Sequence, residues 1–233
     1  MTPAEGGGMS LRLTREIDKL KRQILALGAE VENDVRAAVR GVETRDLAMI
    51  QGVADRENRV NAMEVDVEEE CLKILALYQP VAADLRYIVA VLKINHDLER
   101  IGDLATHIAE RGMFLCSLSP IGIPRELGDM AERAQSMLKK VLDAFVNLDE
   151  SAAREVCAAD KAIDEIHKGI FQKVKQEVLR DPQQFEAQLQ ILHIARHIER
   201  IADHATNIGE DLIYLIEGRI VRHSSEVSDR TCG

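Results

Sequence analysis

The sequence has few of the residues from which several common folds are built. Tryptophan is absent, aromatic residues make up 3% of the chain, and only 5 of the 233 residues are proline. Any core must therefore be packed from Leu, Ile, Val and Ala, a composition typical of helical bundles. Strand-like alternation of apolar and polar residues appears nowhere, so the pattern predicts an all-α protein.

Cysteine is also sparse, and no Cys-x-x-Cys pair occurs. This spacing excludes a zinc knuckle and a disulfide framework. We expect buried thiols of a reducing, cytoplasmic compartment. The cysteines are Cys71, Cys116, Cys157 and Cys232.

Positive charge is in deficit. The chain has 30 Lys and Arg against 40 Asp and Glu, a formal net charge of -10. This balance argues against nucleic acid as the main partner and favours cations and basic protein surfaces. The notable charge-free stretch, residues 112–124, contains Gly and Pro and is shorter than the roughly 20 apolar residues of a membrane span. No signal-peptide pattern is found, so we expect a cytoplasmic protein without membrane insertion.

The usual enzyme motifs are missing as well. The sequence has no nucleophile-base arrangement, no glycine-rich phosphate loop and no dinucleotide fingerprint, which predicts a protein that is not an enzyme. The alternative is a ferritin-like di-iron oxidase or another metal-storage or redox protein. That fold needs Glu-x-x-His pairs pointing into the bundle, and the nearest match, Asp164-x-x-His167, occurs once.

Apolar residues recur at three- and four-residue spacing from Leu11 onward, which predicts helices. Asp46 and Asp149 have the character of N-caps, and Pro80 and Pro182 suit the first turn of a helix. Breaks at Pro80, at residues 117–124 and at Pro182 divide the chain. Six helices are predicted, over residues 10–43, 46–77, 80–116, 125–147, 150–180 and 183–220.

The chain contains an internal repeat. Residues 94–110 match residues 194–210 at nine of 17 positions, where chance gives about one. The helices therefore form two repeated three-helix bundles. The predicted division is a tail at 1–9, a first unit at 10–116, a linker at 117–124, a second unit at 125–221 and a tail at 222–233.

Both copies of the repeat carry an apolar seam with steps of three and four residues. The seam residues are Val91, Ile94, Leu98, Ile101, Ala105 and Ile108, and in the second copy Ile191, Ile194, Ile198, Ile201, Ala205 and Ile208. At about 100° per residue, the carboxylates of the Glu-Arg-Ile-x-Asp motif lie more than 90° from the seam centre. We therefore expect Glu99, Asp103, Glu199 and Asp203 to face outward.

These carboxylates favour a cation site. Glu99 and Asp103 are one helical turn apart, about 6 Å between Cβ atoms, as are Glu199 and Asp203. A hard or borderline cation needs about six oxygen-rich ligands, so the preceding helix must supply the rest. In an antiparallel pair of helices that turns near residues 78–80, Glu57 and Asn61 lie level with Glu99 and Asp103.

The second turn, near residues 181–182, likewise places Asp160 and Asp164 level with Glu199 and Asp203. The pattern thus predicts two acidic clusters, each roughly 30 Å from its turn. Grouped acids repel one another, and a bound cation relieves that repulsion. The alternative is that these residues form ordinary solvated faces of the helices.

Two further residue types near the motif have alternative interpretations. Arg100 and Arg200 could bind phosphate oxygens or a partner, or could pair with a nearby carboxylate such as Asp97 or Asp84. His107 lies one turn beyond Asp103, where it is either an additional ligand or a surface histidine.

The segments QPVAADLRYIVAVLKINHDLERIGDLATHIAE (79–110) and RHIERIADHATNIGED (196–211) closely resemble the PhoU family, over about residues 10–220. The resemblance implies two three-helix bundles and a non-enzymatic negative regulator of phosphate uptake and of the phosphate-starvation response. It implies an adaptor between the ATPase subunit of the phosphate ABC transporter and a sensor histidine kinase. A homodimer is also expected.

The resemblance further implies multinuclear metal clusters, of iron or of Mn, Mg or Zn, bound through Glu/Asp-x-x-x-Asp motifs on the bundle surface. By the motif, the metal ligands are Glu99, Asp103, Glu199, Asp203, Asp160 and Asp164, with Glu57 and Asn61 less closely matched. Asn61 departs from the acidic pattern, so the first cluster is expected to be the weaker one.

Overall fold

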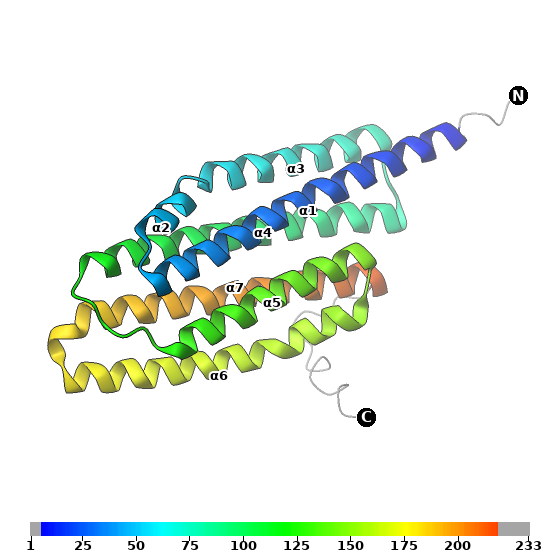
Figure 1. The fold of residues 1–233 in the computed structure, drawn as a ribbon. Helices are drawn as coiled ribbons and strands as arrows, with labels where there is room; N and C mark the ends of the chain where they lie inside the picture. The colour runs from blue at the N-terminus through cyan, green and yellow to red at the C-terminus, as the bar shows by residue number, and fades with distance from the viewer. Residues whose placement is uncertain (1–5, 219–233) are drawn as a thin grey trace, which may run out of the picture.

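The computed structural model describes residues 6–218, and within them every regular element is a helix (Figure 1). The first half contains α1 (Gly6–Thr44), α2 (Leu47–Ala54), α3 (Glu57–Tyr78) and α4 (Ala82–Ser117). The second half contains α5 (Arg125–Asn147), α6 (Glu150–Arg180), the short 3-10 helix η1 (Pro182–Gln184) and α7 (Phe185–Glu217). The predicted all-α fold class is confirmed.

The two halves form two bundles that meet along α4 and α7. In the first half α4 packs against α1, α2 and α3, and in the second half α7 packs against α5 and α6. Helices α4 and α7 lie side by side and run antiparallel through the middle of the molecule (Figure 1). Every residue of the predicted seam is at most 1% exposed, so the predicted packing face is confirmed in both copies.

Several predicted helix boundaries are also found. Asp46 caps α2 by accepting a hydrogen bond from the backbone N–H of Met49 at 3.0 Å, and Asp149 caps α6 through the N–H of Ala152 at 3.0 Å. Pro182 begins η1 as expected. Pro80, in contrast, precedes α4 rather than opening it, because Val81 is extended and the helix begins at Ala82.

The second predicted helix, 46–77, is interrupted between α2 and α3. Asp55 ends α2, and Arg56 turns the chain before α3 begins at Glu57. The guanidinium of Arg56 donates a hydrogen bond of 2.7 Å to Asp34, a carboxylate of α1 that is only 3% exposed. Since a buried charge without a partner is costly, this ion pair stabilises a break that the local sequence does not require.

The N-terminal boundary differs as well. Helix α1 begins at Gly6, so residues 6–9 of the predicted tail are helical. Extending an existing helix costs far less than starting one, and the apolar pattern from Leu11 onward already provides the nucleus. The predicted C-terminal tail lies outside the described residues.

Helices α6 and α7 approach each other closely at Gly209. A Cβ atom there would lie 3.0 Å from Cys157 Sγ and 3.2 Å from the carbonyl oxygen of Ala153, both in α6. Helix α6 also has an open glycine, Gly169, with nothing within 4 Å of its Cβ position. The two positions allow a matched comparison.

We predict that Gly209→Val lowers the free energy of unfolding by about 1–3 kcal/mol, because the added carbons force α6 away from α7. Gly169→Val should leave it unchanged or slightly raised, because glycine is the poorer helix former. Urea denaturation of the two variants beside the original chain measures the difference. Equal stability of both variants would contradict the close packing of α6 on α7.

Candidate functional site

The second acidic cluster (Asp160, Asp164, Glu199 and Asp203) is brought together where α6 packs on α7. Burial, together with the charges of Asp203, Asp164 and Glu199, raises the pKa of Asp160 to about 6. The same causes, burial first and then the Asp203 charge, raise the pKa of Glu199. The level arrangement predicted from the hairpin therefore places these four carboxylates within range of one another.

The prediction that Glu199 faces outward is wrong, because this residue is only 9% exposed. It does point away from the seam with α4, but α6 covers that side of α7. Arg196 donates a hydrogen bond of 2.6 Å to Glu199 Oε1. Asp160 Oδ1 is buried and has no hydrogen-bond partner among the described residues. The cluster thus contains one buried carboxylate held by an arginine and a second with an oxygen left free.

His167 belongs to this site although sequence reasoning did not place it there. Its Nδ1 lies 3.8 Å from Glu199 Oε1. Burial and the charge of Arg196 lower the pKa of His167, which favours the neutral imidazole, the form that binds metals. The signal was present in the sequence, since Asp164 and His167 are three residues apart and share a face of α6.

The first acidic cluster (Glu57, Asn61, Glu99 and Asp103) is less complete. Glu57 and Asn61, on α3, are exposed. Burial and the charge of Asp103 raise the pKa of Glu99. Glu99 and Asp103 on α4 thus interact with each other, whereas Glu57 and Asn61 on α3 contribute less to this cluster than expected.

Arg100 occupies the first cluster itself. Its Nε lies 3.2 Å from Glu99 Oε2 and its Nη1 lies 3.1 Å from Asp103 Oδ2. The alternative partners Asp97 and Asp84 were the wrong carboxylates, because Asp97 instead contacts His204 of α7 at 2.8 Å. The corresponding Arg200 is exposed. In the first cluster the carboxylates of Glu99 and Asp103 are therefore already paired with an arginine. In the second cluster Asp160 has no such partner among the described residues.

The donor chemistry of the second acidic cluster suits a divalent cation. Four carboxylates and a neutral imidazole are ligands for iron, manganese and related ions, and one oxygen of Asp160 is a donor that no group of residues 6–218 uses. Within residues 6–218 no three His, Cys, Asp or Glu side chains stand close enough to hold an ion without adjustment. The metal-binding role of these residues stays a prediction.

The ferritin-like alternative requires metal ligands inside the bundle. The centre of the molecule, where α4 meets α7, is instead lined by Ile, Leu, Val and Ala that are at most 1% exposed. The single Asp164-x-x-His167 pair lies between α6 and α7. The arrangement differs from a di-iron centre with paired inward motifs.

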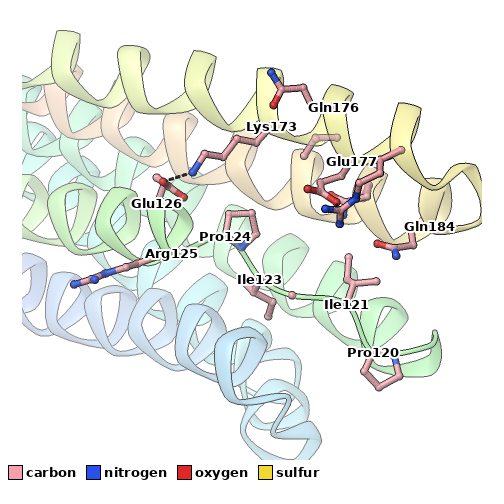
Figure 2. Close-up of a pocket in the computed structure, with 14 residues that line it drawn as sticks. Pro120, Ile121, Ile123, Pro124, Arg125, Glu126, Lys173, Gln176, Glu177 and Gln184 are labelled. Atoms are coloured by element: carbon pink, nitrogen blue, oxygen red, sulfur yellow. Dashed lines mark hydrogen bonds and ion pairs between the residues drawn. The ribbon is translucent and has the colours of Figure 1, made fainter.

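A pocket of about 710 Å³ lies away from these clusters, between the 117–124 linker and the C-terminal half of α6 (Figure 2). Its lining includes two ion pairs, Glu126 with Lys173 and Glu177 with Arg180. Figure 2 shows the first of these pairs crossing from α5 to α6. Because the four charged side chains of these two pairs already have partners, we assign the pocket to the packing of the linker against α6.

No helix within residues 6–218 has an apolar stretch of the length that a bilayer requires. The three thiols in this range, Cys71, Cys116 and Cys157, are free, and Cys71 is fully buried. The fourth cysteine, Cys232, lies outside the described residues.

Comparison with known proteins gives a consistent result. The PhoU domain matches residues 24–112 and again residues 127–212. A phosphate-specific transport system accessory protein PhoU homolog of Pseudomonas putida is 37% identical over 92% of this chain and 84% of its own length. The accessory protein PhoU of Escherichia coli K12 is 31% identical over 92% of this chain and 89% of its own length.

Two solved structures share the fold. The crystal structure of PhoU from Pseudomonas aeruginosa superposes with a TM-score of 0.85 at 36% identity, covering 88% of this chain and 99% of that one. PhoU from Streptococcus pneumoniae gives a TM-score of 0.83 at 27% identity, covering 90% of this chain and 99% of that one.

The raised pKa of Asp160 predicts a pH-dependent stability. A carboxylate whose folded pKa is raised from 3.8 to about 6 destabilises the fold when ionised, and this cost disappears as the pH falls through about 6 toward 3.8. Asp160→Asn should therefore stabilise the protein in chelator at pH 7.5. The gain should be about 1–2 kcal/mol, given about 1.4 kcal/mol per pKa unit and some solvent screening.

Urea titrations at several pH values check this expectation. The advantage of Asp160→Asn should shrink between pH 7 and pH 4, whereas Asp66→Asn, at an exposed position of α3, should change stability little at any pH. An advantage independent of pH would mean that the four carboxylates do not interact as described.

Proposed function

The chain belongs to the PhoU family, and from this premise we propose that it is a negative regulator of phosphate uptake and of the phosphate-starvation response. The observation that carries the proposal is the double match of the PhoU domain, one copy in each half. It is supported by relatives named as phosphate-specific transport system accessory proteins, which align over 92% of the chain.

We propose that the protein acts as a cytoplasmic adaptor and homodimer. Its partners in this scheme are the ATPase subunit of a phosphate ABC transporter and a phosphate-sensing histidine kinase. The net charge of -10 supports docking to basic protein surfaces, because opposite charges increase the rate of encounter. The absence of recognisable catalytic motifs in the sequence also favours a binding role over an enzymatic one.

We further propose that the second acidic cluster holds a divalent cation, iron or one of Mn, Mg and Zn, as part of this role. Asp160 and Asp164 on α6 and Glu199 and Asp203 on α7 are the ligands in this proposal, with His167 beside them. A cation there neutralises carboxylates that repel one another and ties α6 to α7. We assign the first cluster a weaker affinity, since Arg100 already pairs with Glu99 and Asp103.

The metal proposal predicts stoichiometric cation in protein purified without chelator or affinity tag. The double variant Glu199→Ala/Asp203→Ala should lose it, whereas Glu165→Gln, an exposed acid of α6 that pairs with Lys168, should retain it. A cation at 100 times its dissociation constant adds about 2.7 kcal/mol, which is roughly 5–10 °C in melting temperature for a chain of this size. Mass spectrometry of metals and thermal melts measure both quantities.

The metal proposal fails if neither protein holds metal and the two melt alike, which assigns the acidic face to partner docking. A different result, consumption of oxygen or peroxide with turnover by iron-loaded protein, would count against the adaptor role and support the storage or redox alternative.

The regulatory proposal predicts that deleting the gene derepresses phosphate-starvation genes in high phosphate. A plasmid copy of the intact chain should restore repression, and Glu165→Gln should do so equally well. A starvation-promoter reporter, read in high and low phosphate, makes the measurement. Unchanged reporter output after deletion would remove the proposal.

A further inference from the structure

The two ends of the α4–α7 contact occupy equivalent positions in the repeat but differ in charge. At one end, Lys93 Nζ lies 3.1 Å from Asp211 Oδ1 across the helix pair. One turn further along α4, Asp97 Oδ1 lies 2.8 Å from His204 Nδ1 and 3.5 Å from Asn207 Nδ2. Each buried carboxylate at this end has a basic or amide partner.

The repeat, with its offset of 100 residues, places a different set at the other end. The position of Asp97 is taken by His197, and the position of Asn207 by His107. The rings of these two histidines stack across α4 and α7 with their centroids 5.4 Å apart. The next pair in the same antiparallel register corresponds to Lys93 and Asp211, and it consists of His193 and Arg111.

Both carboxylates of the first end have thus been replaced by basic residues. We call His107, Arg111, His193 and His197 the basic cluster. Its charges concentrate on His197: burial, and the charges of His107, Arg111, His193 and Arg200, lower the pKa of that imidazole to about 4. These groups come from both helices that pack at this point, α4 and α7. Such a concentration of positive groups is unusual on a chain with a net charge of -10.

The basic cluster also has hydrogen-bonding groups that nothing in the described part of the chain satisfies. Both ring nitrogens of His197 and the Nε of Arg111 are buried and have no hydrogen-bond partner within residues 6–218. Leaving buried donors unpaired costs free energy, so a partner from solution is favoured. His107 and His193 are exposed, which leaves the cluster open to solvent at its edge.

The sign of these charges selects the partner. A metal cation is disfavoured beside Arg111 and Arg200, whereas an oxyanion accepts hydrogen bonds from guanidinium and imidazole groups at once. We propose that the basic cluster binds a small tetrahedral oxyanion of the phosphate class, held by Arg111, His107, His193 and His197. This site is separate from the acidic clusters, and the regulatory role described above does not require it.

The test is direct binding of inorganic phosphate, and separately of sulfate, to the full-length protein. Histidine side-chain resonances in NMR titrations report the site, and isothermal titration calorimetry reports the affinity. We expect saturable shifts at His107, His193 and His197. Arg111→Gln should weaken binding about tenfold or more, since it removes charged hydrogen bonds.

A second variant uses the repeat itself. His197→Asp places at this end the carboxylate that Asp97 supplies at the other, and it should abolish binding. Lys139→Ala, which removes one positive charge from the exposed surface of α5, is the control and should leave the affinity unchanged. Circular dichroism and thermal melts verify that each variant is folded. If His197→Asp does not fold, Arg111→Gln still tests the site.

Three outcomes would overturn the proposal. They are the absence of saturable shifts with either anion, shifts confined to histidines outside the basic cluster, and equal loss of affinity in Lys139→Ala and Arg111→Gln. Because the measurement is made on purified protein, its failure leaves the reporter experiment on phosphate regulation unaffected.

Discussion

The antiparallel packing of α4 on α7 is the constraint on which the rest of the molecule depends. Both helices bury an aliphatic seam that is at most 1% exposed, and α4 and α7 pack against each other as well as against the other helices of their own halves. Once that seam is fixed, the remaining faces of each helix are determined by the 3.6-residue period. The side of α7 that carries Glu199 and Asp203 must then meet α6, and the acidic cluster forms there as a consequence.

The same seam also explains how a duplicated protein can carry two different surfaces. Aliphatic residues in the centre are interchangeable between copies, so the packing keeps its geometry while the polar residues at its edges diverge. At one edge Asp97 and Asp211 are matched by His204 and Lys93. At the other edge the places of both carboxylates and of Lys93 are taken by His197, Arg111 and His193, and the place of His204 by Leu104. The interior therefore maintains the fold, and the edges carry the chemical difference.

Sequence periodicity predicted the seam, the helix order and the capping residues because these depend on neighbours within a few positions. The break at Asp55–Arg56 could not be predicted, since it depends on the contact of Arg56 with Asp34 in another helix. The partners of Arg100 were missed for a related reason: rotamers decide which nearby carboxylate an arginine reaches. Counting residues from the hairpin turn placed Asp160 and Asp164 correctly, but it could not show that α6 buries Glu199.

One short segment of α7 connects the two kinds of site. Residues 196–203 place Glu199 and Asp203 toward α6 and His197 toward α4. The charge of Arg200 acts on both sides, because it opposes the burial that raises the pKa of Glu199 and of Asp203 and adds to the causes that lower the pKa of His197. If the proposed cation binds at Glu199 and Asp203 and the proposed anion at His197, their opposite charges lie within about two turns of α7 and attract each other, so each ligand strengthens the binding of the other by the same factor.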